Sequence, residues 1–130
     1  MLTDAPLVAF VATTDLARSH TFYADVLRLR HVKATPFANV YDAGGTTLRI
    51  TLVDRVAGAP YTVLGWTVPD TAATADELAR RGVTFKRYEG LHQDAAGVWT
   101  APGGARIAWF CDPDGNVLSV TQPPGPAGAT

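Results

Sequence analysis

One charged side chain stands inside a segment that otherwise reads as a regular strand. The segment TTLRITLV (46–53) alternates apolar and polar residues, and Arg49 falls on the polar side with Thr47 and Thr51. This period of two predicts a strand with two distinct faces. A guanidinium is permanently charged and presents a fork of N–H donors. If Arg49 lines a pocket, it is expected to anchor an anionic or carbonyl-bearing ligand.

Other reactive side chains do not assemble into a known catalytic pattern by spacing. His20 falls in an expected helix, His31 just after it, and His92 in a loop, and each is expected at the surface or at a sheet edge. Cys111 precedes a turn and has no histidine near it in sequence, which indicates a small buried residue rather than a nucleophile. An alternative that stays open is a metal held by His92 and Asp94 with a ligand from another chain.

The elements that must position these residues follow one layout twice. The first half predicts strand 7–12, a helix from about Asp15 to Leu27, β segments 31–33 and 37–41, and strand 46–53. The second half predicts strand 62–68, a helix from Asp70 or Thr71 to Gly82, strand 83–88, a short segment 98–100, and strands 105–111 and 117–121. Asp15 and Asp70 are suitable N-caps, and glycine pairs mark a turn in each half. The sequence therefore predicts two tandem β-α-β-β-β modules.

Two motifs carry a resemblance to a known superfamily. They are DLARS (15–19) followed by FYADVL (22–27), and DPDGN (112–116) before the last strand. At this spacing the chain resembles the vicinal-oxygen-chelate superfamily, which includes glyoxalase I, extradiol dioxygenases, and fosfomycin- and bleomycin-resistance proteins. Arg28 stands where the superfamily usually has glycine, which costs about 1 kcal/mol if the backbone there is left-handed.

The resemblance implies an α+β fold. The two βαβββ modules would form a curved, partly open mixed β-sheet barrel with the helices on its convex side. A single domain is expected over 1–122, with module one at about 7–54 and module two at about 62–122. Residues 123–130, PPGPAGA and a final Thr, are expected to be a disordered tail.

In metal-dependent relatives, four strand residues bind one divalent ion. Carried over by the motifs, these positions are Val8, Arg49, Val63 and Ser119 in this sequence. Two are hydrocarbon, one is a hydroxyl and one is a cation, so they offer no ligand set for a divalent ion. We therefore expect neither a metal nor another cofactor.

The same register predicts the lining of a pocket on the concave face of the sheet. Small residues, hydroxyls and one arginine are typical of a small-molecule site, which is mostly apolar with a few placed polar groups. The expected lining residues are Phe10, Thr47, Arg49, Thr51, Val63 and Ser119. A buried Arg49 needs a partner. The possible partners are a ligand, or an internal group among Asp42, Asp54, Glu89, Asp94 and Tyr41; otherwise Arg49 lies exposed at the pocket mouth.

Aromatic residues on short strands and loops are expected to rim this pocket and to stack on a flat ligand. Trp99 is the best candidate for a ligand wall, and Tyr41 is expected at the rim with Phe37, Tyr61 and Trp109. Trp109 fits an ordinary core position as well. Loop 91–97, which holds His92, is the expected lid.

The bulk composition excludes several classes of function. The chain has 130 residues, 47% hydrophobic and 18% charged, with a net charge of −1. The composition is typical of a globular domain, and a net charge close to zero argues against binding to nucleic acid or to an anionic membrane. The absence of a secretory pattern at the start and the single cysteine favour a cytoplasmic protein.

The sequence thus predicts a metal-independent protein that binds a small anionic or aromatic organic molecule, and in this it resembles the bleomycin-resistance proteins. The alternative is a glyoxalase-like or dioxygenase-like enzyme, a lyase or isomerase, that works without the usual four metal ligands or with a non-standard metal site. In it Arg49 would steady an enolate or carboxylate, and His92, Asp94 or Tyr41 would move protons. A third class is a protein-interaction module. By resemblance, the partner expected beside the ligand is a second copy in a homodimer.

Overall fold

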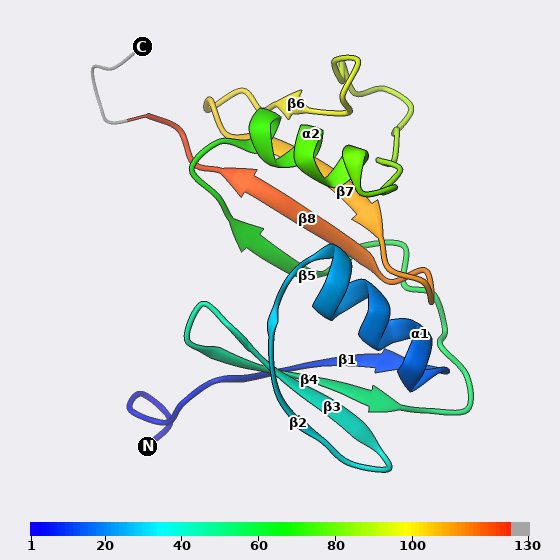
Figure 1. Cartoon of the computed structure of the whole chain (residues 1–130). Coiled ribbons are helices and arrows are strands. Elements are labelled where there is room, and N and C mark those ends of the chain that lie inside the picture. Colours follow the sequence, from blue (N-terminus) through cyan, green and yellow to red (C-terminus); the bar gives the residue numbers. More distant parts are fainter. Residues whose placement is uncertain (126–130) are drawn as a thin grey trace. The chain divides into compact units, whose positions relative to one another are not determined.

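The chain forms two units, Met1–Gly58 and a second that begins at Ala59 (Figure 1). The computed structural model describes residues 1–125. Residues 123–125 have no regular secondary structure, and the rest of the predicted tail, 126–130, lies outside the described residues. We call the two parts unit 1 and unit 2.

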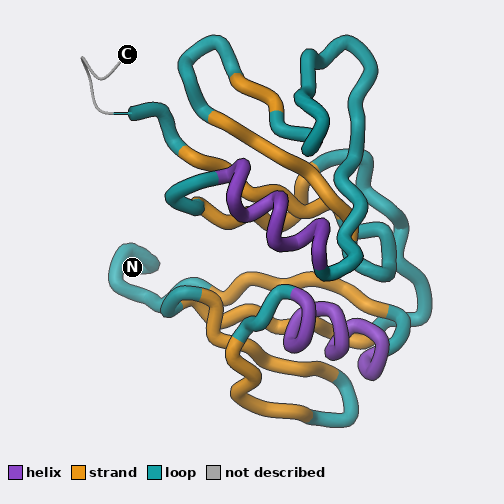
Figure 2. Tube along the Cα trace, turned by 45° about the horizontal axis from the view of Figure 1, so that its top comes forward, coloured by secondary structure: helices purple, strands orange, loops and turns teal. Residues whose placement is uncertain are grey.

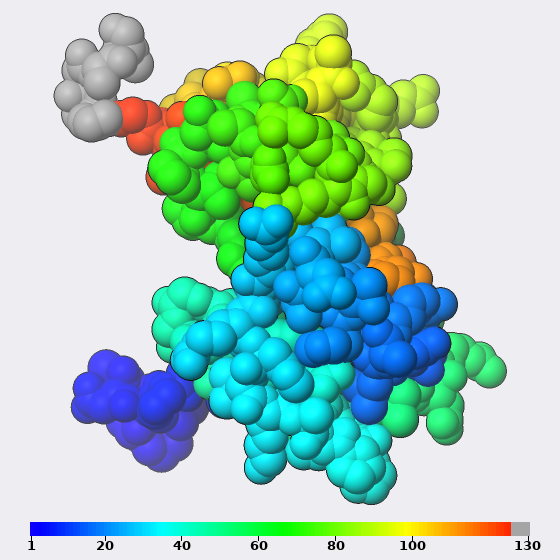
Figure 3. Space-filling model, in the orientation of Figure 1, coloured from blue at the N-terminus to red at the C-terminus, as the bar shows by residue number. Residues whose placement is uncertain are grey.

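Unit 1 holds a four-stranded mixed sheet. Its strands are β1 (Val8–Thr13), β2 (Arg30–Ala34), β3 (Ala38–Ala43) and β4 (Thr46–Leu52), in the order β1-β4-β3-β2. β4 pairs in parallel with β1 and antiparallel with β3, so the opening segment of the sequence becomes a central strand. The first residues of the chain project away from this sheet (Figure 3).

A helix crosses one face of the unit 1 sheet. α1 (Leu16–His20) continues into the wider π-helical turn η1 (Thr21–Val26), which confirms the helix expected from about Asp15 to Leu27. The Asp15 carboxylate caps its start by accepting a hydrogen bond from the Arg18 N–H at 3.0 Å. After the helix, Arg28 has a φ of 58°, so the left-handed turn expected there is present.

In unit 1 the helix lies against one face of the sheet (Figure 2), and the core lies between the two. Leu48 and Ile50 of β4 are 1% and 0% exposed, and Val11 of β1 and Tyr23 of η1 are buried with them. Because strand residues alternate between faces, Arg49, which lies between Leu48 and Ile50, points away from the helix. Leu48 and Ile50 therefore pack under the helix, whereas Leu52 at the end of β4 is 40% exposed.

Unit 2 repeats the strand order of unit 1. Its strands are β5 (Thr62–Thr67), β6 (Trp99–Thr100), β7 (Arg106–Cys111) and β8 (Val117–Gln122), in the order β5-β8-β7-β6. The first and last strands are again parallel neighbours. Asp112, 5% exposed, closes the turn between β7 and β8 by accepting hydrogen bonds from the N–H groups of Asp114 and Asn116.

One helix, α2 (Thr71–Arg80), covers a face of the unit 2 sheet. The Asp70 carboxylate caps it through the Ala73 N–H at 3.1 Å, and Gly82 follows it with a φ of 92°. Ala75 and Leu78 are buried on the side of α2 that meets β7 and β8.

The prediction of a strand at 83–88 is wrong. Only a single bridge forms there, between Phe85 and Phe110, beside a hydrogen bond from the Lys86 N–H to the Trp109 carbonyl. The next backbone groups bond to a side chain instead, because the Gln93 amide accepts from the Tyr88 N–H at 2.7 Å and donates to the Lys86 carbonyl at 2.9 Å. A loop thus replaces the strand.

The α+β class and the two βαβββ modules are confirmed, with one short strand, β6, as the second strand of unit 2. Each sheet has two open edges, so neither unit closes into a barrel by itself. No helix within residues 1–125 has the length and apolar character that crossing a bilayer requires.

Candidate functional site

The unit 1 sheet leaves one face without a helix, which we call the helix-free face of unit 1. Four predicted pocket residues share it, because Phe10 pairs with Arg49 across β1 and β4, and Thr47 and Thr51 flank Arg49 along β4. Phe10 is 65% exposed, Thr47 is exposed, and Arg49 and Thr51 are half-buried. The structure therefore brings these four side chains together on one surface.

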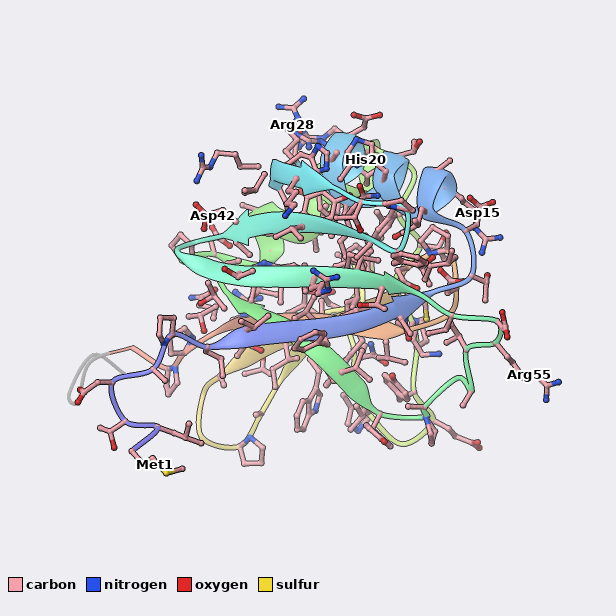
Figure 4. All side chains as sticks on the ribbon, turned by 90° about the horizontal axis from the view of Figure 1, so that it is seen from below. Met1, Asp15, His20, Arg28, Asp42 and Arg55 are labelled. Atoms are coloured by element: carbon pink, nitrogen blue, oxygen red, sulfur yellow. The ribbon has the colours of Figure 1, made fainter. Side chains whose placement is uncertain are left out.

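Arg49 has no ion pair or hydrogen-bonded side-chain partner among residues 1–125. The acid closest to it by strand pairing, Asp42, is engaged elsewhere: it accepts a hydrogen bond from Arg30 at 2.8 Å and from the Gly45 N–H at 2.9 Å. The hydrogen bond from Arg30, helped by that from Gly45, lowers the pKa of the Asp42 carboxyl. Figure 4 shows Asp42 at the end of β3.

Tyr41 does not lie at a pocket rim, and that prediction is wrong. Its ring is 0% exposed on the helix side of β3, opposite Leu48, with its hydroxyl 2.7 Å from His20 Nδ1. Burial, followed by the nearby charge of Asp25, raises the pKa of Tyr41 to about 12. On that face Tyr41 can neither pair with Arg49 nor move protons beside it.

Two histidines pack against Tyr41, and no sequence pattern predicts this cluster because His20 and His31 belong to different elements. The rings of His20 and His31 meet edge to face with centroids 4.6 Å apart, and His31 Nε2 lies 3.2 Å from Asn39 Oδ1. His20 is labelled in Figure 4, on the helix beside the sheet. The cluster stabilises the helix side of unit 1 rather than the helix-free face.

In unit 2, Ser119 is 8% exposed and pairs with Trp109 on the face without a helix, the helix-free face of unit 2. Opposite it on β5 is Gly65, where an added Cβ would lie 2.8 Å from Ser119 Oγ. Val63 falls in a register shift between Thr62 and Leu64, so Thr62, rather than Val63, stands opposite Val117. The bulge thus moves the expected β5 position by one residue.

An aromatic pocket opens on the helix-free face of unit 2. It has a volume of about 350 Å³ and is lined by Pro60, Tyr61, Thr62, Tyr88, Leu91 and Trp109. The rings of Tyr88 and Trp109 stand nearly perpendicular, 83° apart, with centroids separated by 5.2 Å. Two rings nearly at a right angle, together with the apolar side chains of Pro60 and Leu91, offer a flat molecule both a stacking face and an edge contact.

Trp99, the predicted ligand wall, lies next to this pocket. Its ring is 6.1 Å from that of Trp109 and tilted by 32°, since β6 and β7 are neighbours. Lys86 Nζ lies 5.7 Å from the centroid of the Tyr88 ring, so a cation flanks the pocket wall. Sequence reasoning missed Tyr88 and Leu91, because it treated the first as part of a strand and the second as part of a lid.

The loop expected to act as a lid is held by its own hydrogen bonds. The Gln93 side chain bonds three backbone groups, and Asp94 Oδ1 accepts from the N–H groups of Ala96 and Val98, both at 2.9 Å. His92 is exposed and lines no part of the pocket. Asp94 therefore shapes the loop, which leaves its carboxylate committed to backbone donors.

The donor set does not fit a divalent metal. Of the four positions carried over from metal-binding relatives, Val8 is exposed hydrocarbon, Arg49 is a cation, and Ser119 offers a single hydroxyl. The bulge at the remaining position, Val63, brings Thr62 into register, which adds only another hydroxyl. Within the described part of the chain, no three His, Cys, Asp or Glu side chains lie close enough to hold a metal ion.

Comparison with known proteins agrees with the fold. A sequence model of the Glyoxalase/Bleomycin resistance protein/Dioxygenase superfamily matches residues 6–120. No curated protein matches the chain.

Among solved structures, a superfamily member from Sphaerobacter thermophilus DSM 20745 is similar at 23% identity and a TM-score of 0.73, over 94% of this chain and 99% of that one. Lactoylglutathione lyase from Agrobacterium tumefaciens is similar at 19% identity and a TM-score of 0.69, over 92% and 93%. The fosfomycin resistance protein FosX from Listeria monocytogenes is similar at 12% identity and a TM-score of 0.72, over 92% and 93%. These identities establish the fold alone.

Proposed function

The chain belongs to the glyoxalase/bleomycin resistance protein/dioxygenase superfamily, and on that premise we propose that it binds a small, flat organic molecule in the aromatic pocket of unit 2 without a metal ion. The pocket carries this proposal. Its volume of about 350 Å³ lies within the range of small-molecule sites. Fold membership alone does not assign a ligand, because one fold hosts many activities.

The chemistry of the lining supports a flat ligand. Tyr61, Tyr88 and Trp109 supply three rings, and Leu91 and Pro60 add hydrocarbon. Aromatic contacts of this kind contribute about 0.5–1.5 kcal/mol each beyond the area they bury. Thr62 is the one lining side chain outside the tyrosines and tryptophan with a hydrogen-bonding group, so orientation of the ligand depends on few polar contacts.

The lining also supports binding without a metal. None of the six lining residues is a histidine, cysteine, aspartate or glutamate, and these are the side chains that hold divalent ions in proteins.

Two of the similar structures are named for lactoylglutathione and fosfomycin, both small molecules.

The test is a titration of the purified protein with 2-naphthol, a neutral flat probe, followed by tryptophan fluorescence. We expect a saturable change, since Trp109 lines the pocket and Trp99 lies beside it. Tyr88→Ala removes one wall and should weaken binding by about threefold to tenfold. Phe37→Ala is the matched control, because this ring is 68% exposed and lies in unit 1.

Equal affinity in wild type and Tyr88→Ala would exclude the pocket as the binding site. The titration is repeated after dialysis against EDTA and again with added Zn²⁺, Ni²⁺ or Mn²⁺. Unchanged affinity is the expected result, and binding that appears only with one of these ions would overturn metal independence.

A further inference from the structure

We propose that Arg49 and Thr51 of β4 form a binding site for a carboxylate group on the helix-free face of unit 1. The inference does not depend on the aromatic pocket, which lies in unit 2. It starts from an arginine in the middle of a central strand, a place where a protein rarely leaves a cation without a partner.

Strand geometry fixes the direction of Arg49. Its neighbours along β4, Leu48 and Ile50, are buried under the helix, so Arg49 points to the opposite face. There it stands between Phe10 of β1 and Val40 of β3, its paired residues in the two adjacent strands. Its side chain is half-buried. Hydrocarbon neighbours on both sides strengthen any charge-assisted hydrogen bond that it makes.

The internal partners that the sequence suggested do not serve Arg49. Asp42 is engaged by Arg30 and Gly45, and Tyr41 lies on the other face of the sheet. Among residues 1–125 the Arg49 guanidinium makes no hydrogen bond or ion pair. A fork of N–H donors therefore remains available on this face.

Thr51 supplies an independent observation. Its Oγ1 is buried and has no hydrogen-bond partner in the described chain. Thr51 pairs with Ala12 and Ala38, so small apolar side chains surround it on the same face. Residues i and i+2 of a strand are roughly 7 Å apart on the same face, so a ligand group bound by Arg49 lies beside Thr51. A rotation of the Thr51 side chain about χ1 then brings its hydroxyl to that group.

These two donors select the chemical class of the ligand. A guanidinium binds the two oxygens of a carboxylate side by side, and one hydroxyl can donate to either oxygen. One positive charge balances one carboxylate, whereas a phosphate dianion would keep an uncompensated charge on this apolar face. The site thus fits a small monocarboxylate whose hydrocarbon part lies against Phe10.

The experiment compares benzoate with benzamide, which has nearly the same shape and no charge, by isothermal titration calorimetry. The wild-type protein should bind benzoate about tenfold or more tightly than benzamide. Arg49→Gln should abolish this preference, and Arg49→Lys should keep part of it because the charge remains without the fork. Arg55→Gln is the matched control: it removes the same charge from an exposed arginine in the same unit, visible in Figure 4.

Thr51→Val gives a second readout that needs no ligand. Because the Thr51 hydroxyl is buried and unpaired, its replacement by a methyl group should raise the melting temperature while lowering benzoate affinity about threefold. Thr13→Val should lower the melting temperature, because the Thr13 hydroxyl is fully buried and donates to the Asp15 carbonyl. Equal affinity for benzoate and benzamide, an undiminished preference in Arg49→Gln, or tighter binding of inorganic phosphate than of benzoate would each overturn the proposal.

Discussion

The two units have the same strand order, yet they differ in the connection that follows the first helix. In unit 1, η1 leads to β2 through a short turn around Arg28. In unit 2, the chain between α2 and β6 is long and folds into a loop fastened by Gln93 and Asp94. That loop brings Tyr88 and Leu91 to the pocket, whereas a short turn takes its place in unit 1.

The helix sides of the two units are alike, and the helix-free sides are not. Under the helices lie buried aliphatic residues on both central strands. On the helix-free faces, unit 1 presents a cation and hydroxyls, and unit 2 presents tyrosine and tryptophan. The repeat therefore preserves what packing requires and varies what a ligand would contact.

The largest expected effect tests the shared helix side. Ile50→Ala in unit 1 and Leu118→Ala in unit 2 each remove a side chain that is 0% exposed, and each should lower the free energy of unfolding by about 2–5 kcal/mol. Thr47→Ala, on the exposed side of β4, should change it by less than about 0.5 kcal/mol. Urea denaturation followed by circular dichroism measures all three, and a similar loss for Thr47→Ala would contradict the assignment of faces.

The next largest effect on stability is expected in the loop of unit 2 that Gln93 holds together. Gln93→Ala removes three hydrogen bonds to Tyr88, Lys86 and Gly97 and should cost about 1–3 kcal/mol. It should also weaken 2-naphthol binding, since Tyr88 loses its support. His92→Ala alters the exposed neighbour and should leave both the unfolding free energy and the affinity near wild type; a loss as large as that of Gln93→Ala would mean that the loop is held differently.

Tyr41 should make the stability of unit 1 depend on pH in the alkaline range. The folded pKa of Tyr41 is raised to about 12, above the value of 10.0 for a free tyrosine. The stabilisation from the neutral, buried phenol is therefore complete below about pH 10 and is lost as the pH rises towards 12, by about 2 kcal/mol in total.

This loss should disappear in Tyr41→Phe and persist in Tyr61→Phe, because Tyr61 is 66% exposed. Unfolding curves between pH 9 and 11.5 provide the measurement. Parallel pH profiles for wild type and Tyr41→Phe would show that the phenol is not buried in solution.

The smallest effect concerns the helix caps, where the units should match. Asp15 and Asp70 have the same extended backbone and accept hydrogen bonds of 3.0 and 3.1 Å from the residue three positions on. Asp15→Ala and Asp70→Ala should each lower the free energy of unfolding by about 1 kcal/mol. A clear difference between the two variants would break the equivalence of the caps, and Asp15→Asn should restore most of the loss.

Patterns within short windows determined much of this fold. Alternation in 46–53 predicted β4 and the face of Arg49, the two aspartates predicted the helix starts, and glycines predicted the turns. The DPDGN turn and the first helix carried the superfamily resemblance that the sequence model supports. Such signals are readable because they depend on residues two to four positions apart, whose geometry the backbone fixes locally.

Tertiary structure decided the rest, since it depends on pairings between residues distant in the chain. Only the folded sheet shows that Arg30 binds Asp42, which leaves Arg49 without a partner among residues 1–125, and that Tyr41 lies under the helix with its hydroxyl at His20. Likewise, Gln93 displaces a strand by satisfying backbone groups at 86 and 88, which places Tyr88 against Trp109. In each case several groups could form a hydrogen bond with the same donor or acceptor. The sequence shows which groups are available, and the packing of the whole unit decides which of them forms the bond.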